Sequence, residues 1–177
     1  NSVGDLIDYW QRHHAGGAER PLFAFLNLMG AHLPYQPPQN MLDKIAPGIR
    51  SDRHVYNFIR HFNADAAAWA SPPEPPLTDW QQQALLDFYD AEIAAQDEQL
   101  GRLLDYLRKS GALANTTVII AADHGEGHGE HHLFGHGFNV HQELVHVPLA
   151  ISDPERFPRG ARVTSNLSTR RLFHTIL

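Results

Sequence analysis

Two short apolar runs flank a long helical pattern, and this order restricts the fold of the chain more than any other feature. The runs Pro21–Met29 and Thr117–Ala122 each have the length and composition of a buried strand. Between them lies a stretch whose apolar residues recur at helical spacing: Leu86, Tyr89, Ile93, Leu100, Leu104 and Leu107. Strand, long helix and strand in succession indicate an α/β protein, and they predict a mostly parallel sheet flanked by helices.

Local signals set the ends of these elements. Thr78 and Gln81 fit a capping box at the start of the long helix, and Gly111 is a suitable stop. A third strand is expected over residues 147–151, at a sheet edge because Pro148 has no N–H to donate. Shorter helices are expected over residues 5–14, 56–62 and 168–177.

Composition excludes several classes of protein. The chain has 177 residues, of which 42% are apolar, and this is enough for one domain with a real core. Its formal net charge of −6 argues against a nucleic-acid partner. Because it contains no Cys, these residues hold no disulfide, no thiolate-bound zinc and no cysteine nucleophile. No apolar run approaches the roughly 20 residues of a transmembrane segment.

The second apolar run ends at a carboxylate and an imidazole, Asp123 and His124. Ligands of open α/β sheets bind at the carboxyl ends of strands. An oxygen and a nitrogen donor together suit a divalent ion such as Ca²⁺, Mg²⁺, Mn²⁺ or Zn²⁺, with further ligands supplied from elsewhere. The alternative is an ordinary turn, in which Asp123 caps a helix and His124 lies on the surface.

Several ordered motifs go further than this pair. Six segments resemble the sulfatase family of the alkaline-phosphatase-like superfamily: 25–35 with its His-Leu-Pro-Tyr loop, 89–119, Asp123-His124-Gly125-Glu126, Gly129-Glu130-His131, Gly135-His136-Gly137 and Val147-Pro148-Leu149. The resemblance covers nearly the whole chain and is weakest over residues 40–76. It implies a partial alkaline-phosphatase-like fold.

The resemblance also implies a reaction. Members of the family hydrolyse sulfate esters at a divalent metal, usually Ca²⁺, with a formylglycine nucleophile made from Cys or Ser. Asp123 matches the family's metal aspartate, and His124 falls where the next metal ligand is Asn or His. His136 falls where many members bind substrate with Lys, and His32 matches a histidine that assists the leaving group. The implied substrate is a small-molecule or carbohydrate sulfate ester.

The family's nucleophile motif, Cys or Ser followed by x-Pro-x-Arg, and a pair of metal aspartates lie upstream of the histidine loop. Nothing upstream of His32 fits either motif. We therefore expect residues 1–177 to be part of a single sulfatase-like catalytic domain, cut at both ends and inactive alone, with the formylglycine upstream. Residues 152–156 match the letters of the nucleophile motif but lie on the wrong side of the site, so we interpret them as a coincidence.

Two alternatives stay open. A His at position 136 in place of Lys is also compatible with a phosphoester hydrolase, or with a phosphoethanolamine or phosphoglycerol transferase of the same superfamily. A non-enzymatic domain that uses its histidines to bind metal is the third interpretation. It predicts metal binding that survives the loss of Asp123 and falls with the number of histidines.

Overall fold

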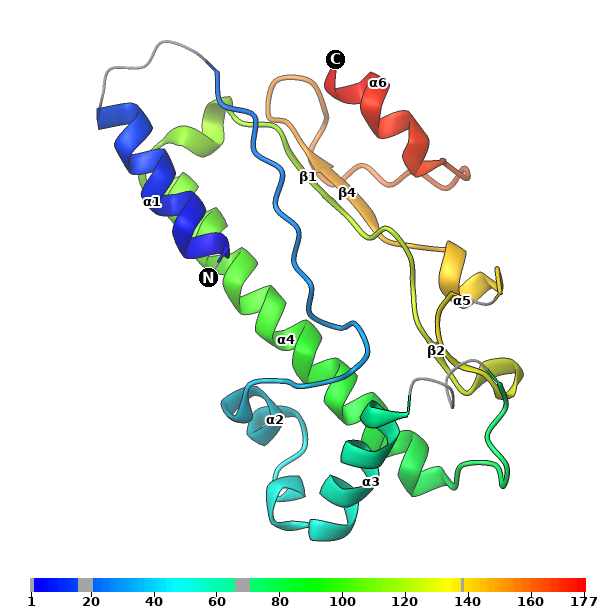
Figure 1. Ribbon diagram of the computed structural model, residues 1–177. Helices are drawn as coiled ribbons and strands as arrows, with labels where there is room; N and C mark the ends of the chain where they lie inside the picture. The colour runs from blue at the N-terminus through cyan, green and yellow to red at the C-terminus, as the bar shows by residue number, and fades with distance from the viewer. Residues whose placement is uncertain (1, 16–20, 66–70, 138) are drawn as a thin grey trace.

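The structure is a computed structural model that describes residues 2–15, 21–65, 71–137 and 139–177. Its helices are α1 (Ser2–Ala15), α2 (Gln39–Ile45), α3 (Arg53–Ala64), α4 (Asp79–Lys109), α5 (Gln142–Val145) and α6 (Leu172–Ile176). Single 3₁₀ turns are η1 (Ile49–Ser51), η3 (Ala112–Asn115), η4 (Glu130–His132) and η5 (Thr169–Arg171). The strands are β1 (Val118–Ala121), β2 (Gly127–His128), β3 (Phe134–Gly135) and β4 (Leu149–Ser152). In Figure 1, α4 runs along most of the molecule.

The predicted ends of the long helix are confirmed. The backbone N–H of Thr78 donates to Oε1 of Gln81 over 2.8 Å, which is one half of the capping box. At the other end, Ser110 caps α4 and Gly111 follows with a left-handed φ of 76°. That φ suits glycine, which has no Cβ to clash with the backbone.

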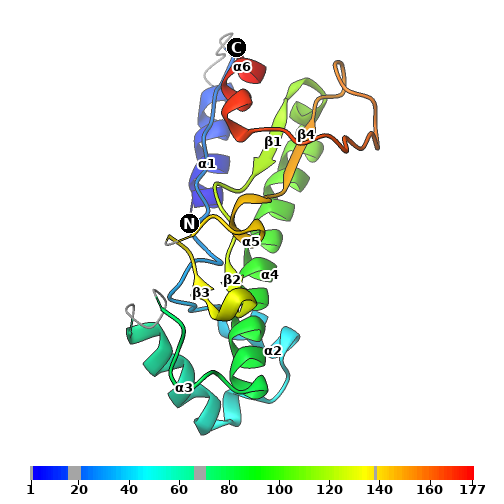
Figure 2. The ribbon, with the colours of Figure 1, turned by 90° about the vertical axis from the view of Figure 1, so that its right-hand side faces the viewer.

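The buried face of α4 differs from the predicted stripe. The residues of its first half that are buried are Ala84, Leu85, Phe88 and Ala91, whereas Ile93 is exposed. The reason is that α2 and α3 pack against this part of α4, as Figures 1 and 2 show. They cover a face that lies beside the predicted one.

One hydrophobic core joins these helices to the loop after residue 30. Its members are Leu33, Tyr35, Met41, Leu42, Ile59, Phe62, Ala84, Leu85, Phe88, Ala91 and Phe134. Burying apolar surface contributes about 25 cal/mol per Å², so this cluster is the main source of stability among the described residues. Because Leu33 and Phe134 flank segments that carry site residues, the core also anchors the site.

The strands confirm the α/β class but pair in an unexpected direction. β1 pairs antiparallel with β4, with Val118 opposite Ser152 and Ala121 opposite Leu149. β2 and β3 form a second antiparallel ladder. Both ladders of the described residues are therefore antiparallel, where a mostly parallel sheet was predicted. A parallel pair needs a crossover that returns the chain to the starting end, and residues 122–148 provide only a hairpin and the short α5.

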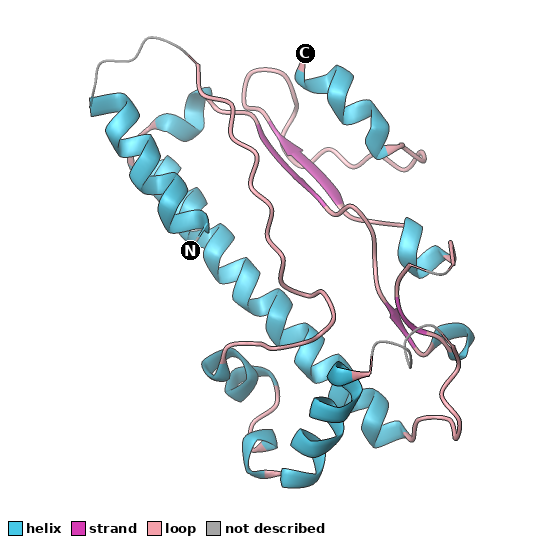
Figure 3. Cartoon of the chain, viewed as in Figure 1, coloured by secondary structure: helices cyan, strands magenta, loops and turns pink. Residues whose placement is uncertain are grey.

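The prediction of a strand over residues 21–29 is wrong for the described residues. Figure 3 colours this segment as loop, because it is extended but has no ladder with a neighbouring strand. Phe23 and Phe25 are exposed, Phe25 by 84%. An apolar run identifies a segment that can be buried in a sheet, but a strand also requires a hydrogen-bonding neighbour.

Candidate active site

The core holds the histidine loop. Leu33 and Tyr35 are buried on either side of the Pro34 position. The backbone of Tyr35 is clamped by Asn63 of α3, whose Oδ1 accepts from the Tyr35 N–H over 3.1 Å and whose Nδ2 donates to the Tyr35 carbonyl over 2.8 Å. His32 therefore projects from a loop that is fixed to a helix.

The turn after β1 is held from the other side. The N–H of Gly125 donates to the carbonyl of Leu144 over 2.9 Å. A Cβ at Gly125 would lie 1.9 Å from the backbone oxygen of Glu143, which is closer than any real contact. Position 125 thus admits only glycine, and this close approach fixes His124 and Glu126 on either side of it.

The β2–β3 hairpin supplies the third segment. Gly127 lies opposite Gly135 in the ladder, so the next pair outward is Glu126 and His136. Oε1 of Glu126 lies 2.8 Å from Nδ1 of His136. Figures 1 and 2 both show the hairpin between α3 and the β1–β4 pair.

These three segments bring three imidazoles together. The ring centroids of His32 and His136 are 4.6 Å apart, and those of His124 and His136 are 4.2 Å apart. One ring nitrogen from each of the three histidines lies within 4.8 Å of the others. We call His32, His124 and His136 the histidine cluster.

Each ring of the histidine cluster already uses its Nδ1. His32 contacts the Leu33 carbonyl, His124 the Gly125 carbonyl over 2.8 Å, and His136 the Glu126 carboxylate. An acceptor on Nδ1 places the hydrogen there and leaves the lone pair on Nε2. The cluster therefore offers Nε2 donors, which is the usual arrangement of histidines that bind metals.

Asp123 adds an oxygen donor beside the cluster. Its Oδ2 is 4.0 Å from Nε2 of His124, and its side chain is 93% exposed. Its Oδ1 also accepts from the backbone N–H of His124 over 3.1 Å. An exposed carboxylate next to imidazole nitrogens fits a divalent ion that completes its shell with further ligands.

A buried carboxylate, that of Glu126, lies next to the histidine cluster. Burial raises the pKa of Tyr35 far above its ordinary value of 10, and the negative charge of Glu126 raises it further. Burial and then Glu126 also raise the pKa of Tyr89. Burial lowers the pKa of His128, although Glu126 opposes this shift. The Glu126 carboxylate therefore lies in a poorly solvated environment of aromatic rings.

The structure thus brings His32, His124 and His136 together, with Asp123 beside them. Sequence reasoning assigned no role to Glu126. The available signal was the glycine on each side of it in Gly125-Glu126-Gly127, which permits the close backbone approaches that bury this carboxylate.

The nucleophile-like segment has a local structural role. Ser152 pairs with Val118 at the amino end of β1, the opposite end from Asp123. Asp153 accepts hydrogen bonds from the Thr117 hydroxyl over 2.6 Å and from the N–H groups of Glu155 and Arg156. These contacts form a turn, in agreement with the interpretation of this motif as a coincidence.

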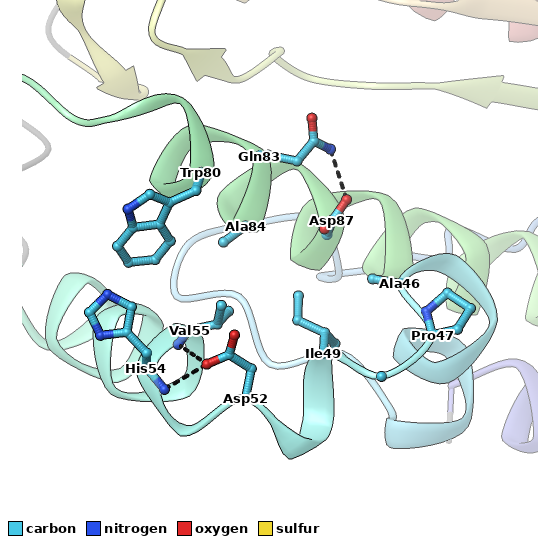
Figure 4. A pocket seen from close by; sticks show the side chains of 11 residues that line it. Ala46, Pro47, Ile49, Asp52, His54, Val55, Trp80, Gln83, Ala84 and Asp87 are labelled. Carbon is cyan, nitrogen blue, oxygen red and sulfur yellow. Dashed lines mark hydrogen bonds between the residues drawn. The ribbon is translucent and has the colours of Figure 1, made fainter.

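A cavity in the described part of the chain lies elsewhere. It has a volume of about 610 Å³ between α2, α3 and the start of α4. Figure 4 shows its lining, in which Trp80 faces His54 and Asp52 caps α3. None of the site residues predicted from the sequence lines this cavity. The histidine cluster, not the cavity, is therefore the candidate site.

Comparison with known proteins identifies the family. The model of the family described as Sulfatase matches residues 2–177. The chain belongs to the sulfatase family. In general, sulfatases use a divalent metal ion and a formylglycine, and the histidine cluster with Asp123 fits the first of these.

Individual sulfatases agree with this assignment. The chain is 33% identical to arylsulfatase K of Danio rerio over 99% of its own length and 36% of that protein. It is 38% identical to an N-acetylglucosamine-6-O-sulfatase of Bacteroides thetaiotaomicron over 48% of its length and 15% of that protein. It is 41% identical to the multifunctional alkaline phosphatase superfamily protein PehA of Trinickia caryophylli over 45% of its length and 15% of that protein.

The fold matches that of a solved structure. A phosphonate monoester hydrolase, SpPMH from Silicibacter pomeroyi, aligns with a TM-score of 0.61 and 24% identity over 88% of this chain and 33% of that chain. The expected alkaline-phosphatase-like fold is therefore confirmed. The chain spans about a third or less of the length of these relatives. None of the described helices has the length and apolar composition to cross a membrane.

Proposed function

We propose that the complete protein hydrolyses sulfate esters at a divalent metal ion and that this chain supplies part of the active site. The observation that carries the proposal is the convergence of His32, His124 and His136 beside Asp123. The match of residues 2–177 to the sulfatase family supports it, as do relatives named arylsulfatase and N-acetylglucosamine-6-O-sulfatase. The substrate class is a small-molecule or carbohydrate sulfate ester.

Asp123 and His124 are the metal ligands of this proposal. The Asp123 carboxylate provides a hard oxygen and His124 provides Nε2, whose lone pair is left free by the contact of Nδ1 with Gly125. A bound divalent ion would polarise the ester and offset negative charge on the transferred group. The family resemblance favours Ca²⁺, and the imidazole donor also suits Mn²⁺ or Zn²⁺. The remaining ligands and the formylglycine come from outside these residues.

His32 and His136 face the substrate in this proposal. His136 binds the sulfate group in place of the family's Lys, and a protonated imidazole there donates a hydrogen bond to a sulfate oxygen. His32 donates a proton to the leaving oxygen of the ester, because an imidazole can transfer a proton near neutral pH. The short distance between the two rings allows one ester group to contact both.

The test uses the complete protein and 4-nitrophenyl sulfate. Replacing His32 with Ala should lower kcat/KM by about 10²–10⁴-fold, the usual contribution of a general acid. Asp123→Ala should abolish turnover and weaken metal binding, measured by calorimetry on the metal-free protein. Asp97→Ala, an exposed acid on α4, is the control and should change neither quantity. Full activity and metal affinity in Asp123→Ala would refute the proposal.

A phosphorus ester is the second candidate substrate. The similarity to PehA, which is named as multifunctional, and the presence of His136 instead of Lys favour it. The two candidates differ in the group transferred, so a comparison of kcat/KM for 4-nitrophenyl sulfate and for an aryl phosphonate monoester decides between them. A sulfatase should favour the sulfate by at least tenfold.

A further inference from the structure

Glu126 is a buried carboxylate that the proposed reaction does not use. Its side chain is only 3% exposed, although an isolated buried charge is costly. Its one ion-pair partner among the described residues is His136. Such a group requires an explanation other than solubility or surface charge.

The hairpin places Glu126 against one particular atom. Because Gly127 pairs with Gly135, residues 126 and 136 are the next cross-strand neighbours. A Cβ at Gly127 would lie only 3.2 Å from the Gly135 oxygen, so the absence of side chains lets the two backbones come this close. Oε1 of Glu126 then reaches Nδ1 of His136 at 2.8 Å, a short and charge-assisted contact.

This contact determines what His136 presents to the site. With a carboxylate accepting at Nδ1, the hydrogen occupies Nδ1 and the ring direction is fixed. Nε2 is then the ring nitrogen of His136 left for the cluster, in which the ring centroids of His32 and His124 lie 4.6 and 4.2 Å from that of His136. The second oxygen, Oε2, is buried and makes no well-aligned hydrogen bond in the described part of the chain. The Tyr35 side chain is near enough to interact with the Glu126 carboxylate, but the hydrogen bond with defined geometry is the one to His136.

We propose that Glu126 is a positioning residue of the sulfatase reaction: it keeps a hydrogen on Nδ1 of His136 and directs Nε2, which carries the second hydrogen when the ring is protonated, at the sulfate group of the ester. This inference rests on the proposed function. Glu126 does not touch the ester itself and acts through His136. A purely structural carboxylate would instead support the hairpin, whatever residue stood at position 136.

A double-mutant cycle in the complete protein separates these roles. Glu126→Ala should lower kcat/KM for 4-nitrophenyl sulfate by about 10–100-fold, as is usual for residues that orient a site histidine. Glu126→Gln should restore most of this loss, because the amide oxygen still accepts from Nδ1–H. In the His136→Ala background, Glu126→Ala should cost less than about twofold, because the group it positions is gone. An equal loss in both backgrounds overturns the proposal.

Glu130→Gln is the matched control. Glu130 follows on the same hairpin, is exposed, and accepts a hydrogen bond from the backbone N–H of His128 over 2.7 Å. Among the described residues it makes no hydrogen bond or ion pair with the histidine cluster, and its change should leave kcat/KM within about twofold, as is usual for surface substitutions. A loss as large as that of Glu126→Ala would contradict the assignment of a specific role to Glu126.

A second readout is independent of activity. Two-bond ¹H–¹⁵N correlations of the His136 ring report which nitrogen carries the hydrogen. The protein and Glu126→Gln should show Nδ1–H, and Glu126→Ala should lose it. If Glu126→Ala loses the Nδ1–H of His136 in a protein that has no sulfatase activity, the proposed function fails while the positioning by Glu126 stands. If Glu126→Ala leaves His136 unchanged, the positioning role is overturned even in an active enzyme.

Discussion

The helical region, formed by α2, α3 and the first half of α4, buries its apolar side chains far more completely than the strand region, formed by β1, β4 and residues 153–177. Leu85 of α4 is 1% exposed, whereas Ile120 of β1 is 38% exposed. Phe173 and Leu177 near the carboxyl end are also exposed. Among the described residues, apolar burial and the stabilisation expected from it are therefore concentrated in the helical region.

The candidate site lies between these regions and depends on both. His32 is fixed through Tyr35 to Asn63 of α3, in the helical region. His124 follows β1, and its turn is fixed to Leu144 before β4. The geometry of the histidine cluster should therefore respond to damage on either side, while global stability responds mainly to the helical region.

The largest effect should come from the helical core. Leu85→Ala removes a fully buried side chain and should lower the free energy of unfolding by about 2–5 kcal/mol. Ile120→Ala, the control in the strand region, should cost about 1 kcal/mol, since its side chain is partly solvated already. Denaturant titration of both variants measures the difference. Equal losses would show that the two regions do not differ in stability.

A smaller loss of stability, with a large effect on the site, should follow Gly125→Ala. The new methyl group would lie 1.9 Å from the Glu143 carbonyl oxygen, so the backbone must shift at a cost of about 1–3 kcal/mol. Because His124 is the preceding residue, this shift should also weaken metal binding, measured by calorimetry.

The control for this change is Gly101→Ala. Gly101 lies within α4, and a Cβ there meets nothing within 4 Å. Alanine should stabilise the helix by about 0.5–1 kcal/mol and leave metal binding unchanged. A Gly125→Ala variant that binds metal normally would show that the turn does not fix the site.

A pH-dependent effect on stability, of intermediate size, should come from His128, which lies beside Tyr89. Burial lowers the pKa of His128, whose ring lies 4.4 Å from that of Tyr89. As pH falls below about 6.5, the unfolded chain takes up the proton first, so His128 reduces stability between that pH and its lower folded pKa. His128→Phe keeps the packing and removes this loss. Between pH 7.5 and pH 5.5 the melting temperature of the parent should therefore fall more than that of His128→Phe. An equal fall in both proteins would exclude the mechanism.

The sequence predicted features that depend on neighbouring residues, such as helix ends, and motifs that are recognised by their order along the chain. The ends of α4 followed from Thr78, Gln81 and Gly111, because caps depend on neighbouring residues. The meeting of His32 with His136 followed from the family resemblance. The pairing of the strands could not be predicted, because the direction of β4 depends on the path of the preceding loop. Residues 21–29 have no strand partner among the described residues.

Glu126 shows the same limit at the level of one side chain. Its burial depends on two-residue strands, which are too short to have a periodic signal. The contact with His136 arises only from the register of that hairpin. The sequence thus pointed to the residues that we propose to carry the chemistry, and the fold was needed to find Glu126, which we propose to orient one of them.

The smallest effect should come from the turn at the far end of the strand region. The hydrogen bond from Thr117 lowers the pKa of Asp153, and the N–H groups of Arg156 and Glu155 contribute to the shift. Because the folded pKa lies below the unfolded value of about 3.9, the charged Asp153 stabilises the protein above that value, and the contribution disappears as pH falls through the folded pKa. Thr117→Val should therefore lower the melting temperature at pH 7, and the difference from the parent should shrink as pH falls through the folded pKa of Asp153. Since this turn is at the opposite end of β1 from Asp123, metal binding should be unaffected. A loss of metal affinity in this variant would show that the two ends of the strand region are coupled, and that the site depends on more of this region than the turn at Gly125.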